Sequence, residues 1–399
     1  MAVEIRPIKE DEMEQFLHVA STSLVMASTS FVGMSPEFTL CAFEDGKLAT
    51  SYAAWPLTMR FNGVAAPVAG VTSVGTLPVY RRRGYLRQVA TTHFNLLHER
   101  GEQAIAILQA SQAAIYQRYG YGIVSTQHIY NVEPRSLKFS QPHPVTGTFR
   151  EVNDDEFPLL VDLYRRFRAD RTGYLHRAKL MWEAGVMAPP PPGAQLNRVV
   201  YQEAGEPLGY VIYIVQPEPE LGPGSVHRLA IRDFIWLTAS AYRALWSYFA
   251  NMDLVGNIVW RRIPSDDPLP HLLLEPRMLR MTSSDDLLGR IVDVERALPL
   301  RHYDEEGSLT FEIVGDDLCP WNCGKWQLEV TGDSSSVSRD RKEPQLVMPI
   351  STLALILFGQ ISATQAARMA RLESNDESAL SMWDRIMRTR YRPACADRF

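Results

Sequence analysis

Apolar and polar positions along the first hundred residues predict a helix, two hairpins and a second helix. Residues 9–25 are mixed and amphipathic, which indicates the first helix. Strand-like stretches break at two turn dipeptides, Asp45-Gly46 and Asn62-Gly63, and such breaks are typical of antiparallel hairpins. Apolar residues then recur at helical spacing, which predicts a helix over about residues 84–100 that ends at Gly101.

Further elements complete a first domain. A short apolar run over 104–108 predicts a buried strand, and residues 113–118 predict a helical turn before Tyr119-Gly120-Tyr121-Gly122. The pattern loosens around residues 135–150, where Gln141-Pro142-His143-Pro144 suits a linker. We therefore expect an α/β domain over residues 1–137.

The remaining chain repeats this order once and then changes it. A helix over 157–167, a four-proline break and three strands precede a helix over 241–249, which predicts a second domain over 138–285. The third domain, 286–399, begins with strands and ends with helices, as an α+β unit does. Its expected strands cover residues 291–294, 308–314, 325–330 and 345–348.

Composition narrows the class of protein. Hydrophobic residues make up 46% of the chain and charged residues 22%, and the net charge is −5. This balance is typical of a globular protein and gives no reason to expect a nucleic-acid partner. No apolar stretch is long enough to span a bilayer, and the N-terminus lacks the features of a secretion signal. We expect a cytoplasmic protein without a membrane partner.

The cysteines and histidines predict no metal site. Four cysteines are too sparse for a disulfide framework, and Cys319 and Cys323 have no second ligand pair nearby. His93 and His98 lie five residues apart on the expected helix and face different sides, so we expect ordinary surface or boundary residues.

One passage carries a specific chemistry. A β-branched run ends at Leu77-Pro78, three arginines and Gly84 follow, and a helix starts directly afterwards. The free N–H groups of a helix start, with arginines beside them, favour binding of a phosphate group. The alternative is a solvated arginine run on the surface.

The order of these parts resembles the acetyl-CoA site of the GNAT N-acetyltransferases, whose pattern is Arg/Gln-x-x-Gly-x-Gly/Ala. Leu86 departs from that pattern at its last position. The chain as a whole resembles the enhanced intracellular survival (Eis) acetyltransferase family. The passages that carry this resemblance are 74–78 with 81–84, Ala110–Gly122, Arg290-Ile291-Val292-Asp293-Val294 and Ala396-Asp397-Arg398-Phe399.

The resemblance implies an α+β fold of two tandem GNAT domains followed by a sterol-carrier-protein-like domain. The second GNAT domain is degenerate, because no Arg-x-x-Gly turn follows its strand at 229–233. The resemblance further implies acetyl transfer to amines, a homo-hexamer and no metal. An apolar face in the third domain is expected to be core rather than a lipid site.

Acetyl-CoA is the implied co-substrate. The expected cofactor-binding residues are Val74, Thr76, Arg81, Arg82, Arg83, Gly84, Tyr85, Leu86 and Ser111. Backbone amides of Val74 and Thr76 would meet the pantetheine arm and the acetyl oxygen, because the family splays this strand from its neighbour. For Ser111 a second interpretation stays open, that of a helix cap.

Two residues are expected to move protons. Tyr116 holds the family position of the general acid, and a phenol is protonated at neutral pH; Tyr119 and Tyr121 are its competitors, and a purely packing ring is the alternative. The family uses the α-carboxylate of its last residue as base, here Phe399. Without the resemblance this chain end would be expected to fray.

The sequence thus predicts an amine N-acetyltransferase that uses direct transfer. The acceptor stays open among aminoglycoside-like polyamines, a protein lysine and a small amine. Asp397 could add to an acidic pocket, but Arg398 places a cation beside the proposed base. The alternative from another class is a non-enzymatic scaffold that binds acyl-CoA or lipid.

Overall fold

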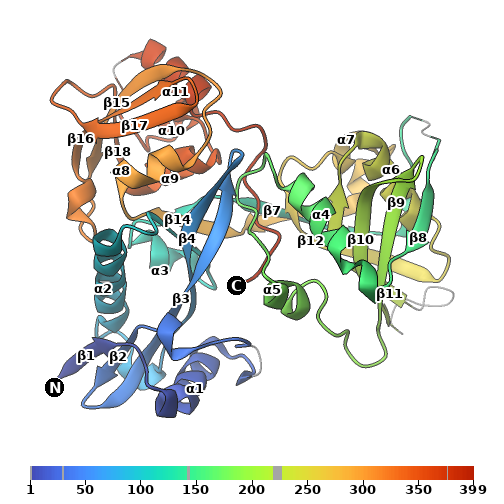
Figure 1. Cartoon of the computed structure of the whole chain (residues 1–399), viewed down its shortest axis with the longest axis horizontal. Coiled ribbons are helices and arrows are strands. Elements are labelled where there is room, and N and C mark those ends of the chain that lie inside the picture. The colour runs from blue at the N-terminus through green and yellow to red at the C-terminus, as the bar shows by residue number, and fades with distance from the viewer. Residues whose placement is uncertain (1, 29–30, 142–143, 219–226, 375) are drawn as a thin grey trace. The chain divides into compact units, whose positions relative to one another are not determined.

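The structure is a computed structural model and describes every residue except 1, 29–30, 142–143, 219–226 and 375 (Figure 1). Contacts divide the chain into two compact units. Unit 1 contains Met1–Ser125, Leu287–Arg390 and Phe399, and unit 2 contains Thr126–Asp286 and Tyr391–Arg398. Pro142-His143 of the expected linker lies outside the described residues.

A seven-stranded sheet forms the first half of unit 1. Its order is β1-β2-β3-β4-β5-β14-β6, and only the β4–β5 pair is parallel. The strands are β1 (Val3–Arg6), β2 (Cys41–Glu44), β3 (Lys47–Phe61), β4 (Val64–Thr76), β5 (Ile105–Gln109), β14 (Leu287–Ile291) and β6 (Gly122–Ile123). Both predicted hairpins are present, because β2 pairs with β3 and β3 with β4 across the two turn dipeptides.

Helices complete this half of unit 1: α1 (Met13–Leu24), α2 (Tyr85–Arg100) and α3 (Ala113–Gln117). Helix α2 agrees with the predicted span and buries Val89, Phe94 and Leu97 in a core shared with β5. Gly101 ends α2 in a left-handed conformation with φ of 70°, which a glycine adopts without steric cost.

The second half of unit 1 is the α+β segment. Its sheet has the order β17-β16-β15-β18, with β15 and β18 parallel. The elements are α8 (Val294–Ala297), β15 (Gly307–Val314), β16 (Gly324–Thr331), β17 (Ser334–Arg339), β18 (Leu346–Pro349), α9 (Ile350–Phe358), α10 (Ala363–Arg368) and α11 (Glu377–Ile386). Nearly every side chain of α9 is buried, so its apolar residues serve as core.

Unit 2 repeats the seven-stranded arrangement. Its order is β13-β7-β12-β11-β10-β9-β8, again with one parallel pair, β11–β12. The strands are β7 (Thr126–Val132), β8 (Thr148–Glu151), β9 (Gln195–Glu203), β10 (Glu206–Pro217), β11 (His227–Trp236), β12 (Val255–Pro264) and β13 (Thr282–Asp285). The helices are α4 (Phe157–Phe167), α5 (Lys179–Ala184), α6 (Ala239–Ala250) and α7 (Leu269–Leu272).

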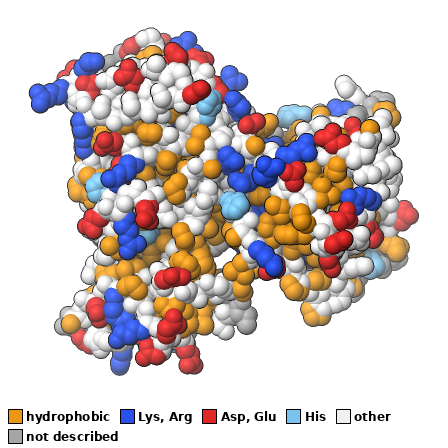
Figure 2. Space-filling view, viewed as in Figure 1, with side chains coloured by type: hydrophobic (Ala, Val, Ile, Leu, Met, Phe, Trp, Pro, Cys, Tyr) orange, Lys and Arg blue, Asp and Glu red, His pale blue; other side chains and the backbone are white. Residues whose placement is uncertain are grey.

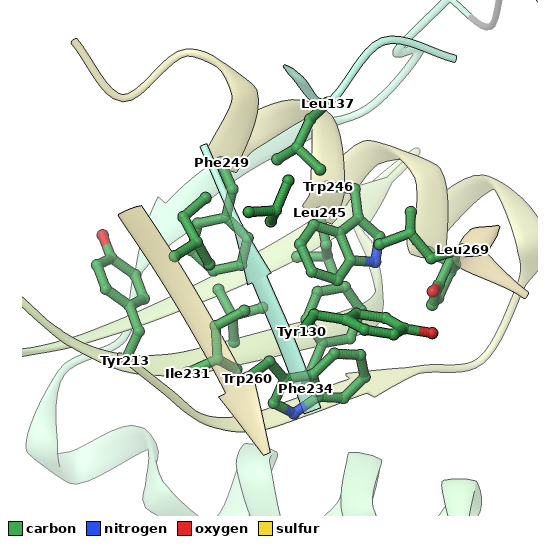
Figure 3. Close-up of a cluster of buried hydrophobic side chains, with 14 of the residues drawn as sticks. Tyr130, Leu137, Tyr213, Ile231, Phe234, Leu245, Trp246, Phe249, Trp260 and Leu269 are labelled. Carbon is green, nitrogen blue, oxygen red and sulfur yellow. The ribbon is translucent and has the colours of Figure 1, made fainter. Parts of the chain in front are cut away.

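Aromatic side chains dominate the main core of unit 2 (Figure 3). Phe234 stacks on Trp260 with ring centroids 4.9 Å apart, and Trp246 of α6 lies 5.2 Å from the Phe234 ring. Packed aromatic pairs of this kind contribute about 0.5–1.5 kcal/mol each beyond the area they bury. The core thus fixes α6 against β11 and β12.

Both seven-stranded sheets contain pairs of strands that lie far apart in the sequence. The chain leaves unit 1 after β6 and enters the sheet of unit 2 as β7, whereas β14, which follows β13, pairs with β5 and β6 of unit 1. Within unit 1, Leu287 donates its N–H to Ser125 Oγ at 3.1 Å, which fastens the entry of β14.

Two expectations from the sequence were wrong, one for the bounds of a strand and one for the burial of a histidine. The strand expected over 291–294 runs over Leu287–Ile291 instead, and Val294 begins α8 because the Asp293 side chain caps the Arg296 N–H at 3.1 Å. His93 is buried rather than at the surface or boundary. Its Nδ1 lies 2.8 Å from the Tyr52 hydroxyl, and desolvation lowers its pKa to about 4.

A buried carboxylate makes the stability of unit 2 depend on pH. Burial raises the pKa of Asp267 to about 6, against three hydrogen bonds that lower it. Tyr242, Tyr130 and the Leu269 N–H all donate to Oδ1, and no described group donates to Oδ2. Because the folded pKa lies above the ordinary 3.8, the folded state gains stability from the protonated acid, and this gain is lost as the pH rises through about 6.

Asp267→Asn is therefore expected to gain stability relative to the wild type as the pH rises. From pH ~5 to ~8 the difference should grow by about 1–2 kcal/mol. Urea unfolding at the two pH values measures it, with the exposed Asp253→Asn as the control carboxylate. An equal difference at both pH values would contradict a raised pKa in the folded state.

Candidate functional site

The turn before α2 has the geometry of an anion site. Gly84 precedes the helix with φ of 80°, Arg82 is also left-handed with φ of 64°, and among the described residues no side chain caps the helix start. A Cβ added at Gly84 would meet no atom within 4 Å, so the space above the turn is open. The first N–H groups of α2, including those of Tyr85 and Leu86, are thus placed to bind a phosphate.

The side chains of this turn divide into two groups. Arg81, Arg82 and Arg83 are exposed, and Arg81 Nε donates to the Thr76 carbonyl at 3.1 Å. Arg83 instead reaches Glu44, with Nη1 2.7 Å from both carboxylate oxygens, and the Tyr85 hydroxyl donates to Glu44 Oε2 at 2.6 Å. The Arg83 and Tyr85 side chains therefore fix the turn to β2, which leaves their backbone groups for the anion.

Strand β4 separates from β5 where the family resemblance implies a splay. The two strands pair only at Ala69–Ala106 and Gly70–Ile107, and within the described ranges the later part of β4 pairs with β3 alone. Ser73 lies at a bulge with φ of 53°, and Ser51 Oγ donates to its carbonyl at 2.9 Å. Val74 and Thr76 lie beyond this bulge, on the part of β4 that has left β5.

Tyr116 lies on the short helix α3 that follows β5. Desolvation raises its pKa to about 12, and its ring packs edge-on against Tyr121 at 5.9 Å. Tyr121 is buried and Tyr119 is partly buried. Ser111 is exposed, and the residue at the cap position of α3 is Gln112, so the helix-cap interpretation of Ser111 is wrong.

The structure brings Phe399 to the point where β4 and β5 part. Thr72 Oγ1 donates to the Phe399 backbone oxygen at 3.1 Å. The Phe399 ring lies over Gly70, because a Cβ at Gly70 would come within 3.1 Å of Phe399 Cδ2 and 2.4 Å of Leu57 Cδ1. The sequence pattern did not indicate a role for Thr72, Gly70 or Glu44, although the lack of a side chain at Gly70 in a β-branched run was a usable signal.

Gly70→Ala is expected to displace Phe399 and to lower kcat about tenfold or more, since misplacement by 1 Å can cost about 10²-fold. The added methyl group must move both Leu57 and the Phe399 ring. Steady-state kinetics in Gly70→Ala and in Gly70→Ala/Leu57→Ala separate the two contacts. Full recovery of kcat in the double variant would trace the loss to Leu57 and not to Phe399.

The corresponding helix start in unit 2 differs. Helix α6 begins after Thr238, whose Oγ1 accepts the Ala241 N–H at 3.1 Å, so a side chain occupies the first-turn donors that are open in α2. Arg-x-x-Gly is also absent from the short link between β11 and α6. Unit 2 therefore offers no comparable anion site in its described part.

Three further observations concern metal sites, membrane spans and the distribution of surface charge. No group of three or more His, Cys, Asp or Glu side chains within the described residues is placed to hold a metal ion. Among the helices that the structure describes, none has the length and apolar character needed to cross a bilayer. Figure 2 shows acidic and basic side chains mixed over the visible face rather than one basic patch.

Comparisons with known proteins agree with this organisation. A family model described as an acetyltransferase (GNAT) domain matches residues 4–124, and another of the same description matches residues 173–291. A sterol carrier protein domain model matches residues 294–396.

Similar proteins cover most of the chain. An uncharacterised N-acetyltransferase of Streptomyces avermitilis is 30% identical over 329 residues, 80% of this chain and 79% of that protein. N-acetyltransferase Eis of Mycobacterium tuberculosis is 28% identical over 331 residues, 80% of this chain and 78% of that protein. The crystal structure of Eis1 from Mycobacterium abscessus aligns with a TM-score of 0.82 at 27% identity, covering 99% and 100% of the two chains.

The tandem sheets, the open helix start of α2 and these matches identify the enzyme class as an acyltransferase. The expected fold of two GNAT domains and a sterol-carrier-protein-like domain is confirmed. The chain belongs to the Eis-like GNAT N-acetyltransferases with a C-terminal sterol carrier protein domain.

Proposed function

We propose that unit 1 transfers the acetyl group of acetyl-CoA directly to a primary amine. The observation that carries this proposal is the hydrogen bond from Thr72 Oγ1 to the Phe399 oxygen, 3.1 Å long, on the strand that leaves β5 at the same point. A carboxylate held there would lie at the opening of the sheet in which this fold accommodates the thioester.

The chain's residues fit the co-substrate. The N–H groups of Arg82–Leu86 bind the pyrophosphate, and the exposed Arg81 and Arg82 add positive charge. The N–H groups of Val74 and Thr76, on the part of β4 that no longer pairs with β5, stabilise the negative charge that develops on the thioester oxygen. Ser111, exposed after β5, adds a further cofactor contact.

Two proton transfers accompany the C–N bond formation. The Phe399 carboxylate accepts a proton from the attacking amine, and Tyr116 donates its phenolic proton to the sulfur as the C–S bond breaks. Burial raises the pKa of Tyr116 to about 12, so the phenol is protonated at neutral pH. Solvent then returns a proton to Tyr116 and removes one from Phe399, which closes the cycle.

The charges near the chain end bear on which amine is the acceptor. Asp397 is buried and paired with Arg177, so it adds no acidity to a pocket, which corrects the contribution considered from the sequence. The acceptor we propose is a primary amine, and its candidate sources are aminoglycoside-like polyamines, a protein lysine and a small amine. The proposed assembly is a homo-hexamer, as the family resemblance implies, and the proposed location is the cytoplasm.

A thiol-release assay with acetyl-CoA tests the proposal. The panel contains aminoglycosides, simple polyamines and lysine peptides, and calorimetry measures acetyl-CoA binding in parallel. Turnover that requires one of these amines would support an N-acetyltransferase and name its acceptor. Binding of acetyl-CoA without turnover across the panel would favour the scaffold alternative.

A further inference from the structure

The segment that precedes Phe399 is built into unit 2. Ala394, Cys395 and Asp397 are all buried, and the Ala394 N–H donates to the Thr172 carbonyl at 3.0 Å. Gly173 allows this close approach, because a Cβ there would lie 2.5 Å from the Ala394 carbonyl oxygen. The segment therefore follows one defined path along unit 2.

A buried ion-pair network, here called the Arg177 cluster, holds Asp397. Its members are Arg177, Asp233, Asp397, Tyr164 and Tyr210. Arg177 Nε donates to Asp397 Oδ1 at 2.7 Å, and the other side of its guanidinium donates to both oxygens of Asp233. The Tyr164 hydroxyl lies 3.2 Å from Asp397 Oδ2.

The cluster demands defined geometry. The Arg177 side chain has no exposed surface, and its guanidinium lies 3.9 Å from the Tyr164 ring centroid. A buried cation is costly unless its partners are close and well oriented, since its hydration is lost. Asp233 alone balances the charge of Arg177. Asp397 therefore adds a second carboxylate whose effect is to fasten the C-terminal segment.

In unit 2 the C-terminal segment lies where two parallel strands separate. Strands β11 and β12 pair only as far as Ile231–Trp260 and then part, as β4 and β5 do in unit 1. Ala396 lines the resulting hollow beside Trp236 and Arg262. In unit 2 the place that corresponds to the proposed cofactor arm of unit 1 is thus lined by the chain's own C-terminal segment.

We propose that Arg177 is a positioning residue for the base, acting through Asp397 to set where Phe399 can lie; this inference rests on the proposed function. Only Arg398 separates Asp397 from Phe399, so the fixed Asp397 keeps the last residue within about 7 Å along the chain.

Asp397→Ala in the full chain tests the proposal, because it leaves Arg177 and Asp233 as a balanced pair. The control is Tyr213→Phe, which removes a partly buried hydrogen bond of unit 2, the one to the Tyr248 hydroxyl. Hydrogen–deuterium exchange of the peptide containing Ala394, kcat, acetyl-CoA affinity and melting temperature are measured for both variants.

The expected result for Asp397→Ala is faster exchange at Ala394 and a kcat lowered at least about tenfold, with acetyl-CoA affinity unchanged. The Tyr213→Phe variant should show neither change at a comparable melting temperature. Asp397→Asn keeps an acceptor for Arg177 Nε and should recover part of kcat, which a general loss of stability would not produce.

Two results would overturn the positioning role. One is faster exchange at Ala394 with wild-type kcat, and the other is unchanged exchange in Asp397→Ala. If the wild type itself turns over no amine, the proposed function fails and the role in catalysis fails with it. The exchange data distinguish that case, since they report on the hold of the segment without any acetyl transfer.

Discussion

Tyr116→Phe is expected to lower kcat of acetyl transfer by about 10²- to 10³-fold, the usual contribution of a general acid. The substitution removes only the hydroxyl group, and the ring keeps its edge-on contact with Tyr121. Acetyl-CoA affinity, measured by calorimetry, should stay unchanged, because the cofactor contacts proposed for the turn before α2 and for β4 do not use the phenol. The loss should thus appear in kcat.

Tyr119→Phe is the matched control, since it removes a partly buried hydroxyl from the turn that follows α3. The pH profile adds a second readout. Burial raises the pKa of Tyr116 to about 12, so the acid keeps its proton throughout the neutral and mildly alkaline range. The pH profile of wild-type kcat should therefore show no decrease with an apparent pKa near 10, the ordinary value of a tyrosine. An equal loss in Tyr119→Phe, or none in Tyr116→Phe, would remove Tyr116 from the role of acid.

Local sequence patterns predicted the helices and hairpins well because those elements depend on neighbouring residues. The spacing of apolar residues placed α2 close to its observed bounds, and α4 runs over Phe157–Phe167 as predicted. The turn dipeptides set the pairing of β3 with both its neighbours. Such signals lie within one turn of helix or one hairpin, where side-chain periodicity acts directly.

Pairing between distant segments was not predictable in the same way. β14 joins β5 although about 180 residues separate them, and nothing in the apolar run at 287–291 specifies its partner. The prediction of a third-domain strand over 291–294 was wrong for this reason, because a short apolar run indicates a buried strand without indicating which sheet the strand joins. The family resemblance supplied the order of domains, which periodicity alone could not.

The candidate site shows the same division. The arginine turn and Tyr116 stand out as motifs, because their residue types and spacing carry the chemistry. Glu44 and Thr72 do not, since each acts on a residue far away in the sequence, at Arg83 and at Phe399. The sequence left Asp397 open as an acidic residue of the substrate pocket. It pairs instead with the buried Arg177, which lies 220 residues earlier in the chain.

Adding one glycine after Phe399 is expected to lower kcat by about 10²- to 10⁴-fold, because it removes the carboxylate from the position of the proposed base. The new carboxylate would lie about 3.5 Å further along the chain. The Thr72 hydroxyl could still donate to the Phe399 carbonyl, which becomes a peptide oxygen without charge. Acetyl-CoA binding by calorimetry should be retained, and thiol release with the accepted amine measures the loss.

Two further variants separate charge from bulk at this position. Conversion of the Phe399 carboxylate to an amide removes the charge with almost no change in size, and it should cause a loss similar to that of the extension. Phe399→Leu keeps the carboxylate and an apolar side chain over Gly70, so its loss should be smaller than either. An amide form with wild-type kcat would exclude Phe399 as the base and would direct the search to another acceptor of the amine proton.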